Sequence, residues 1–383
     1  MSGLYLHIPF CKQACHYCDF HFSTSMKQRE AVLNAMLLEL EMRANYLPDN
    51  SLQSIYFGGG TPSVLSELEL TRLFDAIEKL FILLPDAEIT LEANPDDLSL
   101  YQLNMLAESP INRLSIGVQS FRDDDLLLMN RAHSAEEARK CLNLIRDVWH
   151  KDLTADLIYG MPAMSDADWV ANLDELLAYD LPHFSAYALT VEHRTALHKF
   201  VQQGKVLPAS DEQQMRHFDL LLDIAASKGY EHYEISNFAR PGKRAVHNSS
   251  YWLGSAYLGI GPSAHSFDGK AGRQWNISNN ALYVKALEQG KIAAEFELLT
   301  KADQFNEYLL TRLRTSEGIS LHQVVSRFGS KYLQAIEKQL ADISAGWYEL
   351  SANSLRLSKS GKHYADRIAS ELFILADDEE PTS

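Results

Sequence analysis

The 383-residue chain carries 35 Lys and Arg against 51 Asp and Glu, a formal net charge of −16, and 46% of its residues are hydrophobic. This acidity argues against nonspecific binding to nucleic acid or to anionic membranes. No apolar stretch approaches the ~20 residues of a membrane-spanning helix, and the start, Met1-Ser2-Gly3-Leu4, has no signal-peptide pattern. We expect a cytoplasmic protein with one large domain and a smaller one.

The first predicted strand, Leu4–Ile8, leads directly into a loop with three cysteines in C-x3-C-x2-C spacing, Cys11, Cys15 and Cys18. Three thiolates on one loop select a soft metal centre. A disulfide is disfavoured because three cysteines leave one unpaired and nothing marks the chain as secreted. The fourth cysteine, Cys141, lies alone in a helical pattern and fits a buried hydrophobic position.

Two metal interpretations of the cysteine loop remain open on spacing alone. Structural zinc needs four ligands, usually in two C-x2-C pairs, so a histidine would have to complete the set; the neighbouring histidines are His7, His16 and His21. An iron–sulfur cluster held by three thiolates instead leaves one iron without a protein ligand. Such an open position is where a metal centre can carry out chemistry.

Strand patterns and helical patterns alternate six times along the first half of the chain. The strands are expected at Leu4–Ile8, Ser54–Phe57, Glu88–Glu92, Arg113–Val118, Leu153–Ile158 and Phe184–Leu189. The helices between them are expected at Gln28–Tyr46, Glu67–Leu84, Leu98–Glu108, Ala135–Trp149 and Asp166–Tyr179. Capping-box patterns precede two of these helices, at Ser66 with Glu69 and at Ser134 with Glu137. Six β/α units predict a parallel α/β sheet that forms an open, partial TIM-type barrel, (β/α)6, spanning residues 1–290.

Unusual residues follow or end each predicted strand, where parallel barrels place their functional groups. The cysteine loop follows the first strand, and Gly58-Gly59-Gly60-Thr61-Pro62 follows the second. The later strands contribute Glu92, Gln119, Asp156 and Ala188. Glu92 and Asp156 lie in apolar strands, so they require either an ion-pair partner such as Arg113 or Arg131, or a bound cationic ligand.

A second domain is expected over residues 300–375. Short helices at Asp303–Arg314, Leu321–Phe328 and Tyr332–Ile343, a hairpin at 347–357 and a last helix from about Ser360 resemble a winged-helix module. Its third helix mixes Lys331 and Lys338 with acidic residues, so we expect a cover for protein or substrate and no nucleic-acid contact. The acidic tail, 376–383, is expected to be disordered.

The sequence His247-Asn248-Ser249-Ser250-Tyr251-Trp252 has two interpretations. It fits a surface histidine beside core aromatics. It also fits a heme site, because histidine can ligate heme iron and aromatic rings can stack on a porphyrin. Arg240, Lys243 and Arg244 lie just upstream and would suit propionate carboxylates.

The cysteine spacing, together with Gly-Val-Gln-Ser-Phe at 117–121 and Asp-Leu-Ile-Tyr-Gly at 156–160, resembles the radical S-adenosylmethionine (radical SAM) family. The resemblance implies a 4Fe-4S cluster on Cys11, Cys15 and Cys18, with S-adenosylmethionine on the fourth iron. It also implies that this molecule is contacted by Tyr5, Tyr17, Gly60, Thr61, Glu92, Gln119, Arg131, Asp156, Ala188 and His265. For Tyr17, packing of the cluster loop is the alternative role.

The motif at 247–252 is similar to that of the heme-chaperone branch of the family, which implies heme contacts at His247, Asn248, Tyr251 and Trp252. That branch is related to oxygen-independent coproporphyrinogen III oxidase, an enzyme that decarboxylates porphyrinogen propionates. The oxidase has a further cysteine where this chain has Phe20, and a longer arm before the cluster than the ten residues preceding Cys11. The resemblance therefore favours heme transfer over decarboxylation. Heme-acceptor proteins, including membrane heme proteins contacted from the surface, and a homodimer are the expected partners.

Overall fold

The computed structural model describes residues 2–375, so the predicted acidic tail at 376–383 lies outside the described residues. Six parallel strands form the centre of a twelve-stranded sheet and follow one another in chain order. They are β1 (Ser2–Ile8), β2 (Ser51–Gly59), β3 (Ile82–Ala93), β4 (Arg113–Gln119), β5 (Asp152–Tyr159) and β6 (His183–Ala188). All six predicted strands are thus present, each paired in the predicted parallel order.

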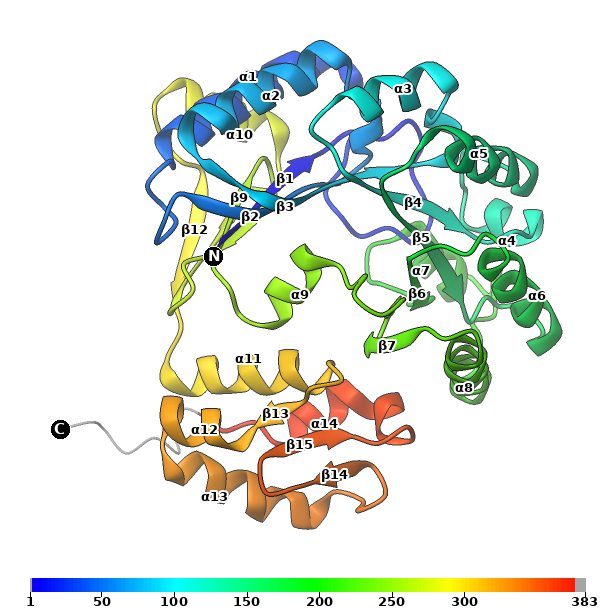
Figure 1. Ribbon diagram of the computed structural model, residues 1–383, viewed down its shortest axis with the longest axis vertical. Coiled ribbons are helices and arrows are strands. Elements are labelled where there is room, and N and C mark those ends of the chain that lie inside the picture. Colours follow the sequence, from blue (N-terminus) through cyan, green and yellow to red (C-terminus); the bar gives the residue numbers. More distant parts are fainter. Residues whose placement is uncertain (1, 376–383) are drawn as a thin grey trace.

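Helices on the outer side of the curved sheet connect these strands (Figure 1). They are α1 (Arg29–Met42), α2 (Glu67–Leu80), α3 (Leu100–Glu108), α4 (Asp123–Leu128), α5 (Ala135–Val148) and α6 (Asp166–Leu177). The expected capping boxes are formed at Ser66 and Ser134, where the Glu at the third helical position binds back to the cap. Cys141 is buried on α5, as predicted.

The predicted helix Glu67–Leu84 was too long. The chain turns from helix to strand at Phe81, and β3 begins at Ile82. Leu83 pairs with Leu52 of β2, so hydrogen bonding across the sheet overrides the helical spacing of the apolar residues.

Further strands extend the sheet on both sides, and the barrel does not close. Beside β1 lie β9 (Tyr257–Ile260), which is also parallel, and then the antiparallel β10 (His265–Phe267), β11 (Gly272–Asn276) and β12 (Ala294–Leu298). Beyond β6 lie the antiparallel β8 (Asn237–Ala239) and β7 (Glu231–Glu234). The sheet ends at β12 and β7, which are not paired with each other, so the open-barrel prediction is confirmed.

Four further helices belong to this part of the chain: α7 (Ala196–Gln202), α8 (Asp211–Ser227), α9 (Val246–Trp252) and α10 (Asn280–Glu288). Figure 1 shows α9 between the barrel and the C-terminal helices. None of the four was among the predicted helices.

Residues 301–371 form a separate group of elements below the barrel in Figure 1. Its helices are α11 (Lys301–Leu313), α12 (Leu321–Phe328), α13 (Ser330–Gln339) and α14 (Ala365–Glu371), and its sheet comprises β13 (Ile319–Ser320), β14 (Tyr348–Leu350) and β15 (Ser354–Leu357). These elements surround a second hydrophobic core that includes Phe305, Phe328 and Tyr332, distinct from the barrel core. We call this group the C-terminal module.

Candidate functional site: a cluster loop and a barrel interior

The three loop cysteines lie at the C-terminal end of β1, half-buried and not engaged in disulfides. Backbone contacts hold the loop: the amide of Cys11 donates to Ser23 O (3.1 Å), and that of His16 donates to Met129 O (2.9 Å). Burial raises the pKa of the Cys18 thiol to about 12, and burial also raises the pKa of Cys11. Thiols in such surroundings stay protonated until a cation replaces the proton.

Arg131 connects the cysteine loop to the ends of two strands. Its guanidinium donates to Cys15 Sγ and to Tyr17 Oη (3.5 Å each), to Gly117 O of β4 (2.8 Å), and to the side-chain oxygen of Asn94. The Nε of Arg131 is buried and has no hydrogen-bond partner in the described chain. Cys15, Tyr17 and Arg131 therefore lie in contact with one another.

The glycine loop after β2 packs directly on the cysteine loop. The amide of Gly60 donates to Ile8 O (2.9 Å), and that of Thr61 donates to Phe10 O (2.8 Å). A Cβ on Gly60 would lie 2.7 Å from both of those carbonyl oxygens, so only glycine allows this approach. The Thr61 hydroxyl in turn hydrogen-bonds the Cys11 thiol.

The interior of the barrel contains a layer of polar side chains below the cysteine loop. Tyr56 donates to Glu92 Oε1 (2.7 Å), and the ring of Tyr5 lies 6.2 Å from that of Tyr56. Burial raises the pKa of Glu92 to about 7 and that of Asp156 to about 6. Asp156 receives hydrogen bonds from Ser115 and Ser185, and neither acid forms an ion pair in residues 2–375. The structural ion pairs considered from the sequence, with Arg113 or Arg131, are therefore not formed.

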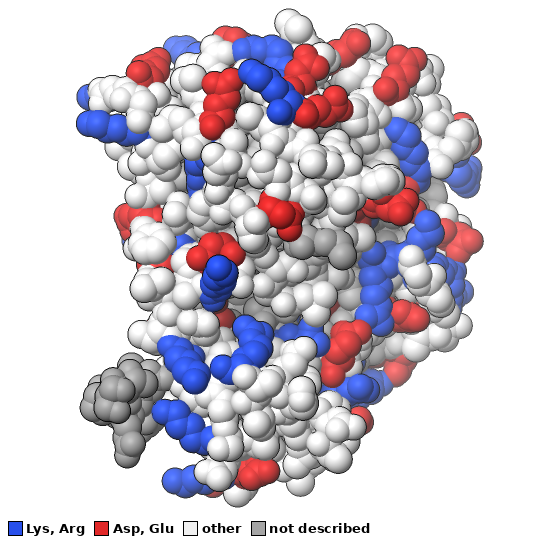
Figure 2. All heavy atoms as spheres, turned by 60° about the vertical axis from the view of Figure 1, so that its left-hand side comes forward, with Lys and Arg blue, Asp and Glu red and all other residues white. Residues whose placement is uncertain are grey.

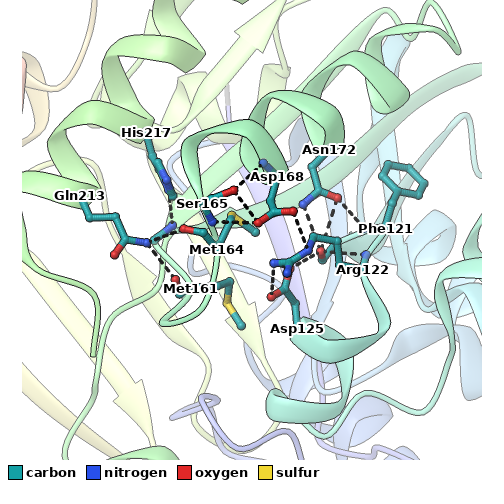
Figure 3. Close-up of polar contacts among 12 residues, drawn as sticks. Phe121, Arg122, Asp125, Met161, Met164, Ser165, Asp168, Asn172, Gln213 and His217 are labelled. Carbon is teal, nitrogen blue, oxygen red and sulfur yellow. Dashed lines mark hydrogen bonds and ion pairs between the residues drawn. The ribbon is translucent and has the colours of Figure 1, made fainter. Parts of the chain in front are cut away.

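Gln119 ends β4 at a bulge, with a positive φ of 67°. Bulges beside active sites redirect a side chain, and here the Gln119 side chain lies over Gly117. The chain after Gln119 is fixed by Asn172, which accepts from the amide of Phe121 (2.7 Å), and by Arg122, which pairs with Asp125 and Asp168 (Figure 3). Figure 3 also shows Gln213 holding the loop after β5 through the carbonyls of Met161 and Met164.

Two other predicted S-adenosylmethionine contacts lie at the same end of the sheet. Ala188 is the last residue of β6, opposite Tyr159 of β5. His265 begins β10, and its exposed ring lies 6.2 Å from that of Trp275.

His247 lies near the opposite end of the barrel. Its Nδ1 is 2.9 Å from Ser54 Oγ, and its ring stacks on Tyr56 at 5.0 Å. Ser54 pairs with Gly3, whereas Gly59, at the end of β2, pairs with Ile8. Five residues of strand separate the two levels, about 16 Å at 3.3 Å per residue. Burial lowers the pKa of His247 to about 4, so the imidazole is neutral.

Tyr251 and Trp252 do not share the surroundings of His247. They line a cavity of about 190 Å³ between the end of α9, β10, β11 and α11, together with Tyr257, Phe267 and Tyr308. Lys270, Arg273 and Arg327 also line it, and Figure 2 shows Lys and Arg side chains near the junction of the barrel and the C-terminal module. Asn248 is half-buried on α9 between the two environments.

The upstream cations that the sequence assigned to propionates already have acidic partners. Arg240 pairs with Asp180 (2.5 Å), Lys243 with Asp152 (2.8 Å), and Arg244 with Glu231 and Glu317. All three cations are thus paired within the described chain.

The thiols fit a cluster better than a single zinc ion. Within residues 2–375, no three His, Cys, Asp or Glu side chains converge as one metal ion requires. In a 4Fe-4S cubane each thiolate binds a different iron, so its ligands need not converge. His7 cannot complete a zinc site, because its ring nitrogens already contact Tyr5 Oη (3.1 Å) and His21 O (2.9 Å).

Comparisons with known proteins agree with this geometry. Residues 5–176 match the model of the Radical SAM superfamily. The chain is 31% identical to the "Heme chaperone HemW" of Bacillus subtilis over 94% of this chain and 96% of the relative. It is 33% identical to the protein of that name from Mycobacterium tuberculosis, over 97% of this chain and 94% of the relative.

This chain belongs to the HemW family of radical SAM proteins.

A solved structure of coproporphyrinogen III oxidase (HemN) from Escherichia coli has the same fold. Its TM-score is 0.83, with 23% sequence identity, covering 97% of this chain and 90% of that chain. Membership of the radical SAM superfamily implies a 4Fe-4S cluster and S-adenosylmethionine, and the cysteine, Gly60 and Arg131 arrangement described above fits both groups. In the described residues, no helix is long and apolar enough to cross a membrane.

Sequence reasoning missed residues whose role depends on packing. Tyr56 contacts both Glu92 and His247, and Ser54 fixes the His247 ring. Both lie on β2 with even spacing from Gly58 and therefore face the same side of the sheet. That alternation was visible in the sequence, but the partners across the barrel were not.

Proposed function

We propose that this HemW-family protein is a heme chaperone that binds a 4Fe-4S cluster, S-adenosylmethionine and heme, and passes heme to acceptor proteins. The main support for this proposal is sequence similarity to "Heme chaperone HemW" proteins over nearly the whole chain. The separation of the cysteine loop from helix α9 supports it, because two ligands can then bind at once.

At the cluster end, Cys11, Cys15 and Cys18 would hold the cluster, with Arg131 and Thr61 hydrogen-bonded to two of the thiols. When bound, the cluster and S-adenosylmethionine supply one-electron chemistry. Gly60 lets the glycine loop pack against the cysteine loop. Burial raises the pKa of Glu92 to about 7, so this carboxyl is partly protonated at neutral pH and ionises when an ammonium or sulfonium group approaches. Tyr5, Tyr17, Gln119, Asp156, Ala188 and His265 complete the proposed contacts.

At the other end, we assign heme to α9. A neutral imidazole is required of an iron ligand, and His247 is neutral above about pH 4. Tyr251 and Trp252, with Asn248 beside them, offer aromatic faces in a cavity that also holds Lys270. Arg273 lines the same cavity and pairs with Glu297 and Glu307. Simultaneous contact of one heme with His247 and Trp252 requires α9 to shift.

The C-terminal module acts as a cover for that cavity in this proposal. Tyr308 and Thr311 of α11 form one wall of it, and Arg314 stacks on the Trp252 ring at 5.3 Å. The boundary expected from the sequence at 290–300 begins too early, because β12 (Ala294–Leu298) belongs to the barrel sheet; we place the boundary at 299–300, before α11.

Heme titration followed in the Soret band tests the heme assignment. Wild type should bind heme stoichiometrically, and His247→Ala should weaken binding about tenfold or more through the lost iron ligand. His322→Ala is the matched control, since His322 is exposed on α12. Unchanged binding in His247→Ala would remove His247 from the site, and no heme binding to wild type would refute the chaperone function.

The second candidate function is oxidative decarboxylation of coproporphyrinogen III, favoured by the fold shared with HemN. An anaerobic assay with S-adenosylmethionine, reductant and porphyrinogen distinguishes the two. We expect no vinyl product. Vinyl product accompanied by 5′-deoxyadenosine would establish the oxidase instead.

A further inference from the structure

A polar cavity of about 450 Å³ opens at the N-terminal ends of β3 to β6, away from the cysteine loop. Its walls come from Asp86–Glu88, Asn112–Arg113, His150–Leu153, Pro182–His183 and the segment before α9. Nothing in the proposed function uses this cavity, although it ends beside Val246, the residue before His247.

Arg113 is the unusual residue in this cavity. Its side chain is 5% exposed, yet its guanidinium forms no hydrogen bond with any described residue, and Nη2 is an orphaned buried donor. Arg113 forms an ion pair with Glu88, in which Oε2 lies 3.7 Å from Nε, longer than a hydrogen bond. A buried guanidinium without hydrogen bonds is costly, and native proteins rarely leave one in that condition.

The other charged groups on the cavity wall already have partners. Glu88 accepts from the amides of Val246 and His247 (2.9 Å each), and Asp152 pairs with Lys243. Lys151 donates only to the backbone carbonyls of Ala107, Ser109 and Ile111. The free hydrogen-bonding capacity on this wall therefore belongs to Arg113, whose Nη2 is unpartnered in the described chain although its Nε lies in an ion pair with Glu88.

We propose that this cavity binds a carboxylate, with Arg113 as its principal contact. A planar, singly charged anion matches the guanidinium fork. Phosphate is a poorer match, because Asp86, Glu88 and Asp152 line the same cavity and would repel a dianion. Burial beside Arg113 also lowers the pKa of His247, which places the two side chains within electrostatic reach.

The carboxylate has two sources: a heme propionate, if heme binds at α9 as proposed above, or a free small carboxylate. Only the first source rests on the proposed function.

The direct test is a titration of the protein with sodium propionate, followed by the 15N-labelled arginine Nε–H resonances. The Arg113 resonance, assigned by its loss in Arg113→Lys, should shift saturably with propionate and not with phosphate. Lys243→Gln, which alters a wall cation already paired with Asp152, should respond as wild type does. An Arg113 resonance that does not respond to propionate would overturn the proposal, as would an equal response to phosphate.

A second arm compares heme with heme dimethyl ester, whose propionates cannot ionise. If the source is heme, wild type binds heme about tenfold more tightly than the diester, and Arg113→Lys narrows this difference. If heme and heme dimethyl ester bind equally tightly while the Arg113 resonance still shifts with propionate, the cavity binds a free carboxylate. Failure of all heme binding would refute the chaperone function while leaving the propionate titration decisive. Should Arg113→Lys not fold, any Nε–H resonance of the wild type that shifts saturably with propionate and not with phosphate supports the proposal, and the absence of such a resonance overturns it.

Discussion

At the residue scale, the barrel interior contains acidic groups that form no ion pair within residues 2–375. Glu92 and Asp156 lie near one another among tyrosines, and burial raises the pKa of both carboxyls. Proteins that leave carboxylates in such surroundings use them for a bound cation or accept a cost in stability. The cost is measurable in the protein without its ligands.

We expect Asp156→Asn to stabilise the ligand-free protein above pH 6. The pKa of Asp156 rises from 3.8 to about 6, so the folded state favours the protonated acid. The protonated Asp156 carboxyl makes its full contribution to the free energy of unfolding below pH 4. That contribution is lost as the pH rises through 6, which lowers the free energy of unfolding by about 3 kcal/mol at 1.36 kcal/mol per pKa unit.

Urea denaturation from pH 4 to 8 checks this expectation. Asp156→Asn should lose that part of the pH dependence, whereas Asp86→Asn, at an exposed position, should keep it. Parallel pH profiles for wild type and Asp156→Asn would contradict the assignment.

At the element scale, the cysteine loop depends on the glycine loop beside it. Two hydrogen bonds join Gly60 and Thr61 to the backbone of Ile8 and Phe10, and no side chain fits between them. The position of the thiols therefore follows from backbone contacts between the ends of β1 and β2.

Gly60→Ala should displace the cysteine loop and lower cluster assembly. The added Cβ meets two carbonyl oxygens at 2.7 Å, and overpacking of this kind costs roughly 1–3 kcal/mol. Iron and acid-labile sulfide per chain, measured after anaerobic reconstitution, should both fall. Gly346→Ala is the control, because its Cβ meets only Ser344 Oγ at 4.0 Å. Full cluster content in Gly60→Ala would show that the loop position is set elsewhere.

At the scale of the whole molecule, the contacts between the C-terminal module and the barrel include one that is largely buried, at Arg314. Arg314, at the end of α11, pairs with Glu234 of β7 (3.0 Å) and with Asp366 (3.0 Å), and covers the Trp252 ring. Glu234 is 1% exposed, so this carboxylate depends on its partners.

Arg314→Met should destabilise the protein by about 3 kcal/mol, because it leaves the Glu234 charge buried without its cation. The free energy of unfolding, measured by urea denaturation, checks this. Arg367→Ala removes an exposed pair with Glu371 and should cost less than about 1 kcal/mol. Equal effects of the two substitutions would mean that the Glu234 pair does not stabilise the junction.

The sequence alone predicted the three loop thiols as donors and determined the order of the strands. Cysteine spacing and the alternation of apolar strands with amphipathic helices are local patterns, so Cys11, Cys15 and Cys18 and the six parallel strands could be predicted from neighbouring residues. The sequence also indicated that the glycine loop and the cysteine loop lie at the same edge of the sheet, because they follow successive parallel strands.

Only the tertiary structure determined which residues from distant parts of the chain contact one another. Strand β9 pairs with β1 across more than 250 residues of chain, and α9 brings His247 to Ser54 and Tyr56 while leaving Trp252 in another cavity. The orphaned Nη2 of Arg113 was equally invisible in the sequence, because hydrogen bonding depends on all the elements that surround a side chain. Sequence spacing indicates which residues share a face of a helix or strand. Burial, unpartnered donors and shifted pKa values arise only when elements far apart in the sequence pack against one another.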